Sequence, residues 1–168
     1  KEMQIVFQDP YSSLNPKKTI RSILSEGYLI HHTVSKKDLN DVLALLSEKT
    51  GISKDMWDQY PHELDGGKRQ VVGIARALAA RPEILLMDEP FGAVDEITRG
   101  QLQQEIRRIH EDRGITILFV THDIEEALKL GSRVLILDQG KIEQYAAADE
   151  ILQNPATEFV KQLVSSCR

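Results

Sequence analysis

Two stretches of this 168-residue chain decide its fold: residues 64–70, LDGGKRQ, and residues 84–90, ILLMDEP. In the first stretch, a Gly-Gly pair opens a helix that we predict over residues 66–80. In the second, an apolar strand predicted over residues 84–87 ends in two adjacent carboxylates, Asp88 and Glu89. Open α/β sheets bind ligands at the carboxyl ends of their strands, so this pair marks a candidate site.

Predicted strands and helices alternate from about residue 82 onward, which indicates an α/β domain with a parallel sheet. The preceding segment is largely helical. We therefore interpret residues 12–80 as a helical subdomain and residues 81–168 as the second part of the α/β core. The predicted strands are 4–7, 84–87, 115–120, 134–137 and a partner strand at 142–145. The predicted helices are 20–31, 35–50 capped by Ser35, a short turn at 55–60 closed by Pro61, 66–80, 95–113, 123–130, 148–153 and 156–164.

Composition excludes several classes of protein. The net charge of −5 argues against non-specific nucleic-acid binding, which needs a basic face. Cys167 is the only cysteine, so no disulfide forms within the chain. No apolar run approaches the roughly 18 residues that a membrane-spanning helix needs. With 41% hydrophobic and 28% charged residues, the composition is that of an ordinary globular domain.

The carboxylates at the end of the predicted strand suit phosphate chemistry. One carboxylate can hold Mg²⁺, and its neighbour can orient and deprotonate an attacking water. His122 follows the strand predicted over 115–120, and it lies beside Asp88 and Glu89 if the two strands are neighbours. A histidine in that place can hydrogen-bond a terminal phosphate. Taken alone, the carboxylates also fit a solvated strand end, and the histidine an ordinary surface residue.

The Gly66-Gly67 pair begins a helix that Asp65 can cap. The N-terminus of a helix attracts anions, and glycine lets a phosphate approach the backbone closely. A plain junction between loop and helix explains the pair equally well. Gln8, at the end of the first predicted strand, carries no meaning by itself.

Taken together, these motifs resemble the ATP-binding cassette family, the ATPase subunits of ABC transporters. The resemblance extends over nearly all 168 residues, and five motifs follow one another in the order of the family. They are Gln8 as the Q-loop, Leu64–Lys68 as the signature Leu-Ser-Gly-Gly-Gln, 84–88 as Walker B followed by Glu89 as the catalytic glutamate, Gly92–Asp95 as the D-loop and His122 as the switch histidine.

The resemblance implies a P-loop NTPase-like core that uses ATP and Mg²⁺. In this family two cassettes pair head to tail, and ATP lies between the Walker motifs of one and the signature of the other. The implied roles are Asp88 and Gln8 for Mg²⁺, Glu89 as general base, His122 and Gln8 as sensors of the γ-phosphate, Asp65, Gly66, Gly67 and Lys68 for the nucleotide, and Asp95 near the dimer interface. The helical subdomain would meet a transmembrane permease beside the Gln8 loop. That partnership implies a cytoplasmic subunit, peripheral on the inner face of the cell membrane.

The chain departs from the family in two respects. First, none of the 168 residues forms a Walker A loop, Gly-x4-Gly-Lys-[Ser/Thr]. We therefore expect weak or no ATP binding by this chain alone, and an incomplete sheet with exposed apolar surface or an unpaired edge. Oligomerisation or strand exchange would cover that surface. Second, Asp65 and Lys68 replace the signature serine and glutamine. Facing a phosphate about 4 Å away at an effective dielectric near 20, Asp65 adds roughly 4 kcal/mol of repulsion per unit charge, which Lys68 would partly offset.

Two questions stay open on the sequence. The chain is either part of a transport ATPase, or a non-catalytic remnant that keeps the permease-docking and dimer surfaces. A DNA-repair or chromosome-maintenance ATPase of the same superfamily is disfavoured, because those chains carry long coiled coils where this one has a compact helical insert. The solute is open too. Residues 7–16 resemble peptide and nickel importers, whereas 91–95 and 154–160 resemble importers of glycine betaine and other osmoprotectants. Both resemblances favour import over export.

Overall fold

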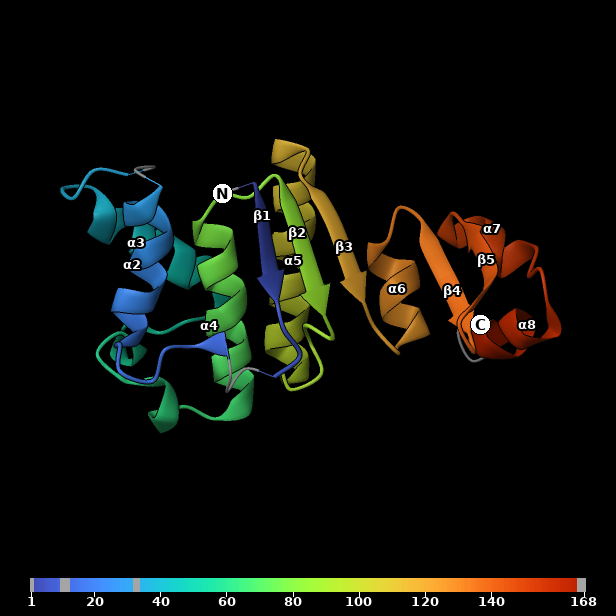
Figure 1. Cartoon of the computed structure of the whole chain (residues 1–168), viewed down its shortest axis with the longest axis horizontal. Helices are drawn as coiled ribbons and strands as arrows, with labels where there is room; N and C mark the ends of the chain where they lie inside the picture. The colour runs from blue at the N-terminus through green and yellow to red at the C-terminus, as the bar shows by residue number, and fades with distance from the viewer. Residues whose placement is uncertain (1, 10–12, 32–33, 166–168) are drawn as a thin grey trace. The chain divides into compact units, whose positions relative to one another are not determined.

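The computed structural model describes residues 2–9, 13–31 and 34–165. The chain divides into two compact units, residues 1–120 and residues 121–168, and each unit is described by itself. Figure 1 labels the helices and strands of both. The predicted division at residue 80 falls inside the first unit. It separates a helical part of that unit from a sheet part, and stays a prediction.

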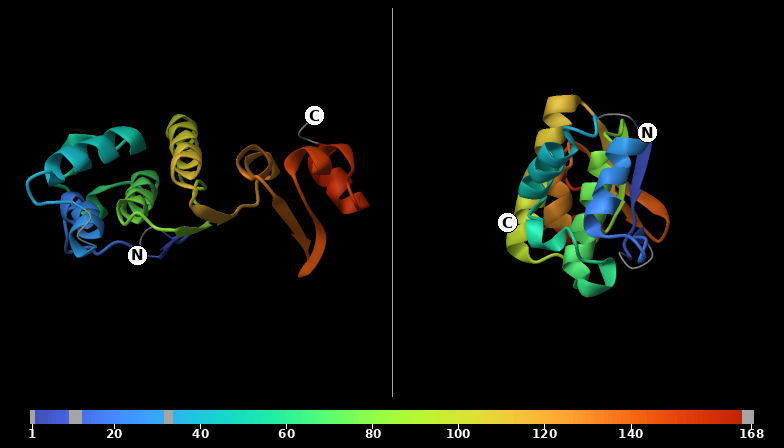
Figure 2. Two further views of the ribbon diagram at one scale, coloured as in Figure 1. Left: turned by 90° about the horizontal axis from the view of Figure 1, so that it is seen from above. Right: turned by 90° about the vertical axis from the view of Figure 1, so that its left-hand side faces the viewer.

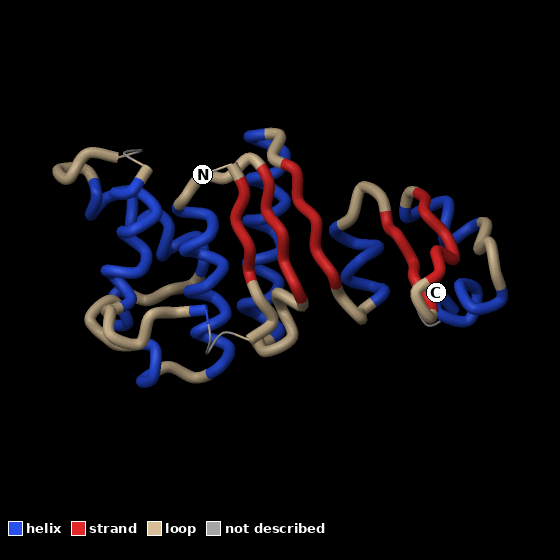
Figure 3. Tube along the Cα trace, viewed as in Figure 1, coloured by secondary structure: helices blue, strands red, loops and turns tan. Residues whose placement is uncertain are grey.

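A three-stranded parallel sheet forms the centre of the first unit, coloured red in Figure 3. The strands are β1 (Met3–Val6), β2 (Ile84–Asp88) and β3 (Thr116–Val120), in the order β1-β2-β3. β2 is central, as its run of apolar residues predicts. The register pairs Asp88 with Val120, so the carboxyl ends of β2 and β3 meet at one edge of the sheet.

Helices cover one face of this sheet. α4 packs on β1 and on α2, and α3 packs on α5. In the left view of Figure 2, α4 and α5 lie on the same side of the strands. Leu85 and Met87 of β2 are buried beneath this layer. The helical elements of the unit are α2 (Ile20–Ile30), α3 (Leu39–Thr50), the 3₁₀ turns η1 (Lys54–Met56) and η2 (Pro61–Glu63), α4 (Gly66–Ala79) and α5 (Glu96–Arg113).

The other face of the sheet is apolar and exposed. Residues 84–87 of β2 are apolar on both faces of the strand, but only one face is covered. The exposed fractions of Ile84, Leu118 and Val120 are 39%, 61% and 57%. We call this surface the open sheet face; it comprises Met3, Ile5, Ile84, Leu118 and Val120. Its exposure confirms the expectation that an incomplete sheet leaves apolar surface uncovered.

Two of the helix boundaries that differ from the predictions have a local explanation. The helix predicted from Ser35 begins at Leu39, because residues 35–38 form a turn. In that turn the Ser35 hydroxyl donates to the Asp38 carboxylate at 2.7 Å and accepts from the Asp38 N–H at 3.3 Å. Pro61 opens the turn η2 rather than closing a helix. Its ring fixes φ near the helical value and its missing N–H is not needed in a first turn.

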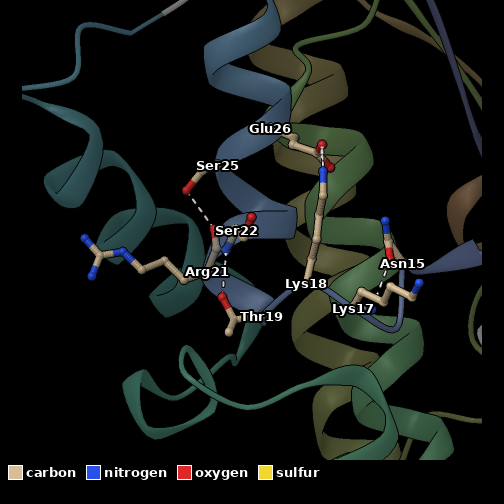
Figure 4. A network of polar contacts seen from close by, with 8 residues as sticks. All are labelled: Asn15, Lys17, Lys18, Thr19, Arg21, Ser22, Ser25 and Glu26. Carbon is tan, nitrogen blue, oxygen red and sulfur yellow. Dashed lines mark hydrogen bonds and ion pairs between the residues drawn. The ribbon is translucent and has the colours of Figure 1, made fainter.

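Local polar contacts fix the start of α2, as Figure 4 shows. Thr19 caps the helix by accepting a hydrogen bond from the Ser22 N–H at 3.4 Å. One turn further on, the Ser25 hydroxyl donates to the Arg21 carbonyl at 2.6 Å. Lys18, just before the helix, pairs with Glu26. These contacts anchor the segment that leads from the first strand into the helical layer.

The second unit is a β-hairpin packed on helices. β4 (Val134–Asp138) and β5 (Lys141–Ala146) pair antiparallel. Their apolar residues Val134, Ile136 and Ala146 form a core with α7 and α8. The helices of this unit are α6 (Ile124–Leu130), α7 (Ala148–Gln153) and α8 (Glu158–Ser165).

This hairpin corrects one expectation. We predicted residues 134–137 as a further strand of the parallel sheet with a partner strand at 142–145; the two strands do pair, but β4 and β5 form a separate two-stranded sheet. The pairing of β4 with β5 is set by the turn between them. Gln139 and Gly140 have φ of +47° and +78°, the two positive values of the tight turn that pairs neighbouring strands most readily.

Candidate functional site

The candidate site begins at the carboxyl end of β2. Asp88 is the last residue of the strand and is exposed, and Glu89 follows half-buried. The Glu89 N–H donates to the Val120 carbonyl at 2.9 Å, so the end of β2 is fastened to the end of β3. The two strands are therefore neighbours, as the sequence argument required. The site carboxylates thus stand on a rigid sheet edge.

Glu89 has the backbone conformation of a strained residue. Its φ is +46°, in the left-handed region, where a side chain costs about 1–2 kcal/mol relative to the right-handed form. The following residues hold it there: the Gly92 N–H donates to the Glu89 carbonyl at 3.3 Å, and Pro90 and Phe91 are buried. Strain of this kind persists where the surroundings fix it, and it clusters at functional sites. No pattern in the sequence predicts this conformation.

Asp65 is the N-cap of α4, as predicted. Its Oδ1 accepts a hydrogen bond from the Lys68 N–H at 2.8 Å, and its Oδ2 lies 3.2 Å from the Lys68 ammonium. The backbone hydrogen bond from Lys68 is the main reason that the pKa of Asp65 is lowered from its usual value. The aspartate is therefore ionised at neutral pH, and both of its oxygens are turned toward Lys68.

The two glycines at the start of α4 are required for different reasons. A Cβ on Gly67 would lie 2.7 Å from the Ala93 carbonyl oxygen, a contact that forces the backbone to move. Gly67 thus lets α4 pack directly against the loop 92–95. A Cβ on Gly66 would meet nothing within 4 Å. No neighbour in the described chain explains this glycine, and the space beside it is open.

A cleft of about 420 Å³ adjoins these residues. It brings the 64–68 segment together with the 92–95 loop and with the end of α3. Asp95 lines it and caps α5 by accepting from the Thr98 N–H at 3.0 Å, a hydrogen bond that lowers the pKa of Asp95. The lining residues are Gly51, Ser53, Met56, Asp65, Gly67, Lys68, Val71, Ala93, Asp95 and Thr98. The charged groups of the cleft are thus two capping aspartates and one lysine.

Three long side chains that the sequence analysis missed hold the loops of this region. The buried Arg69 donates from Nε to the Leu64 carbonyl at 2.8 Å. Gln70, also buried, donates to the Phe7 carbonyl at 3.4 Å, next to Gln8. Arg99 donates to the Val94 carbonyl at 3.2 Å. The sequence feature that could have indicated Arg69 and Gln70 is that they form a polar pair on a helix otherwise rich in alanine and valine.

The remaining predicted residues lie outside this cluster. Gln8 is exposed, two residues beyond β1. His122 is exposed, two residues beyond β3, and belongs to the second unit. There Asp123 caps α6 by accepting from the N–H groups of Glu125 and Glu126 at 2.9 Å and 3.2 Å. The roles of Gln8 and His122 at the nucleotide stay predictions.

The carboxylates at the end of β2 fit a magnesium ion that takes most of its ligands from water and from the phosphate groups of a bound substrate. Among the described residues, no group of three or more histidine, cysteine, aspartate or glutamate side chains is arranged to hold a metal. Mg²⁺ commonly takes one or two carboxylates and completes its shell with water and phosphate oxygens. Asp88, exposed at the end of β2, suits that arrangement.

The parallel sheet, its helical layer and the carboxylates at the strand ends define the class: an α/β protein with a P-loop NTPase fold. Comparisons identify the family. Residues 1–92, more than half of the chain, match the protein family described as ABC transporter, and the chain belongs to that family. In the described parts of the chain, no helix has the length and apolar character needed to cross a membrane.

The relatives are ATP-binding subunits of transport systems. The chain is 38% identical over 167 residues to the oligopeptide transport ATP-binding protein OppF of Bacillus subtilis, covering 99% of this chain and 55% of that protein. It is 53% identical over 111 residues to the glycine betaine/carnitine/choline transport ATP-binding protein OpuCA of the same species, covering 66% of this chain and 29% of that protein. The chain thus spans about half the length of the first relative and less of the second.

A solved structure agrees with the fold. A dimeric ATP-binding cassette in a post-hydrolysis state, bound to ADP and Pi, superposes with a TM-score of 0.76 at 28% identity. The match covers 88% of this chain and 63% of that one. The predicted family and the predicted α/β fold are therefore confirmed.

Proposed function

We propose that this chain is the signature-bearing part of an ATPase subunit that drives solute import through a membrane permease. The observation that carries the proposal is Glu89: a half-buried carboxylate, held at a strained φ of +46° beside Asp88 on a rigid sheet edge. A remnant without catalysis has no need to keep such a residue under strain. The proposal therefore favours the ATPase over the non-catalytic alternative.

The residues act in two half-sites of a head-to-tail dimer. At one, Glu89 accepts a proton from the water that attacks the γ-phosphorus, and Gln8 and His122 contact that phosphate. Asp88 and Gln8 would hold Mg²⁺, and the bound ion would neutralise phosphate charge. At the other, the 64–68 segment faces the nucleotide carried by the second subunit, and Asp95 lies near the dimer interface. The Walker A loop has to come from a segment outside the 168 residues, so this chain alone binds ATP weakly or not at all.

We propose an osmoprotectant of the glycine betaine type as the solute. The support is the identity of 53% over 111 residues with the Bacillus subtilis OpuCA protein, and of 49% over 124 residues with the glycine betaine uptake protein YehX of Escherichia coli. The oligopeptide relative matches a longer stretch at 38%. Uptake of labelled glycine betaine and of a labelled peptide, in cells with and without the gene, separates the two solutes. Loss of peptide uptake alone would overturn the assignment.

The catalytic proposal is tested in the complete cassette, in which this chain is joined to a Walker A-containing segment. Glu89→Gln should lower the rate of ATP hydrolysis by about 10²–10⁴-fold, because the general base is lost. Glu83→Gln is the matched control, since Glu83 is exposed at the opposite end of β2 and should leave the rate unchanged. Hydrolysis is followed by phosphate release. An equal rate in both variants would contradict the role of Glu89, and micromolar ATP affinity of the isolated chain would contradict the two-half-site model.

A further inference from the structure

The segment that carries Gln8 leaves the sheet before it reaches that residue. The pairing of β1 with β2 ends at Val6, opposite Met87, so Phe7 and Gln8 lie beyond the paired residues. Gln8 is exposed, and the residue before it, Phe7, is 52% exposed. Neither strand pairing nor its own burial therefore fixes the place of Gln8.

Two long polar side chains of α4 hold this segment on both sides of Gln8. Gln70 donates from Nε2 to the Phe7 carbonyl at 3.4 Å, directly before Gln8. Arg76 donates to the Ser13 carbonyl, on the other side of Gln8. In both hydrogen bonds the partners are 63 positions apart along the chain, so these are tertiary contacts rather than local turns. α4, which packs on β1 (Figure 1), supplies both donors.

Both donors are polar groups kept in a buried helix face. Gln70 is 2% exposed, and the next residues along α4, Val71 and Val72, are buried and apolar. A buried side-chain amide is costly unless it is hydrogen-bonded, and a hydrocarbon side chain of similar length would pack without that cost. Burial also lowers the pKa of the half-buried Arg76 guanidinium. The contacts with the Gln8 segment give a reason for a polar side chain at both positions.

We propose that Gln70 and Arg76 are positioning residues for Gln8. They hold the carbonyls on either side of it, and so keep its side chain where Mg²⁺ binds. This inference rests on the proposed function, in which Gln8 is a ligand of Mg²⁺, and names the residues that place this ligand. Groups that fix a metal ligand from behind raise metal affinity, because the ligand loses less freedom when the ion binds. Since both side chains contact backbone carbonyls and not the ion, they should act only through Gln8.

Three methionine variants separate positioning from general packing. Gln70→Met removes the donor but keeps a side chain of similar length, which methionine packs adaptably. Arg76→Met is an independent second variant; Glu26, the acidic group near Arg76, keeps Lys18 as its partner. Gln103→Met is the matched control, because Gln103 is also a buried glutamine, 5% exposed, but lies on α5. Urea unfolding midpoints of the three variants report any loss of stability.

The experiment measures metal binding to the complete cassette with ATP bound, and uses Mn²⁺ as the probe. The background is Glu89→Gln, so that ATP persists, and bound Mn²⁺ is measured by electron paramagnetic resonance. Gln70→Met and Arg76→Met should each raise the Mn²⁺ concentration for half-saturation about three- to tenfold, the effect of losing one hydrogen bond. Gln103→Met should leave it unchanged. In a protein that also carries Gln8→Ala, the first two changes should have no further effect.

The outcomes separate this inference from the proposed function. If Gln8→Ala does not change Mn²⁺ binding, the metal role of Gln8 in the proposed function fails, and this inference fails with it. If Gln8→Ala weakens binding but neither Gln70→Met nor Arg76→Met does, only the inference fails. A weakening that persists in the Gln8→Ala protein, or that Gln103→Met reproduces, also overturns it, because the side chains would then act through the fold as a whole.

Discussion

Glu89 is held in a backbone conformation that glycine adopts at lower cost. Its φ of +46° lies in the left-handed region, and its backbone N–H and carbonyl are both engaged, by Val120 and Gly92. The carboxylate is therefore placed by the fold at the expense of local strain. When a strained residue is needed for function, replacing it should raise the stability of the protein and remove its activity.

Glu89→Gly should raise the free energy of unfolding by about 1 kcal/mol, because relief of left-handed strain exceeds the entropy cost of glycine. The same change should abolish ATP hydrolysis in the complete cassette. Gln139→Gly is the matched control: its φ is +47°, in the β4–β5 turn, so it should stabilise equally and leave hydrolysis intact. Urea unfolding and phosphate release measure the two effects. A destabilising Glu89→Gly would show that the side chain supports the loop.

At the scale of an element, the N-terminus of α4 is built by three adjacent positions with separate tasks. Asp65 caps the helix, Gly66 leaves room beside its first turn and Gly67 lets it touch the loop 92–95. The cap and the glycines are visible in the sequence as a helix start. The sequence does not show which of the two glycines the packing requires. That depends on the carbonyl of Ala93, about 26 positions further along the chain.

Substituting alanine for Gly66 and for Gly67, one at a time, should distinguish the roles of the two glycines. Gly67→Ala should lower the free energy of unfolding by about 1–3 kcal/mol, since its Cβ would lie 2.7 Å from the Ala93 carbonyl oxygen. Gly66→Ala should raise the free energy of unfolding by up to about 1 kcal/mol, because alanine has the higher helix propensity and its Cβ meets nothing within 4 Å. Denaturant unfolding of both variants provides the comparison. Equal destabilisation would mean that the first turn of α4 packs differently from the structure described.

At the scale of the whole molecule, the open sheet face is the largest departure from an ordinary globular surface. Met3, Ile5, Ile84, Leu118 and Val120 bring apolar surface to one side of the sheet. Both outer strands, β1 and β3, also present an edge that pairs with no other described strand. Large apolar patches and free edges favour association. This supports the expectation that oligomerisation or strand exchange covers the incomplete sheet.

The isolated chain should therefore self-associate at micromolar to millimolar concentrations. Leu118→Ser should weaken that association by removing a 61% exposed leucine from the open sheet face. Ile97→Ser is the control, because Ile97 is 77% exposed but lies on α5, away from that face. Sedimentation velocity over a range of concentrations detects the difference. A chain that stays monomeric, or responds equally to both changes, would contradict a role for the sheet face.

The sequence by itself determined the family, the parallel α/β core and the residues of the signature and Walker B motifs, because these depend on local patterns: apolar runs, capping residues and motif order. It left open whether the strands at 84–87 and 115–120 are neighbours, which the structure shows them to be. It predicted the strand at 134–137 and its partner strand at 142–145, and was wrong only in adding the first of them to the parallel sheet, because β4 and β5 form a sheet of their own.

Only the tertiary structure decided the strain at Glu89, the packing of Gly67 on Ala93 and the engagement of both Asp65 oxygens by Lys68. It also decided that one face of the sheet is covered and the other open. Each of these features depends on atoms that distant segments, or side chains in particular rotamers, bring together. A pattern along the chain records which residues are present, whereas their contacts are set by packing in three dimensions.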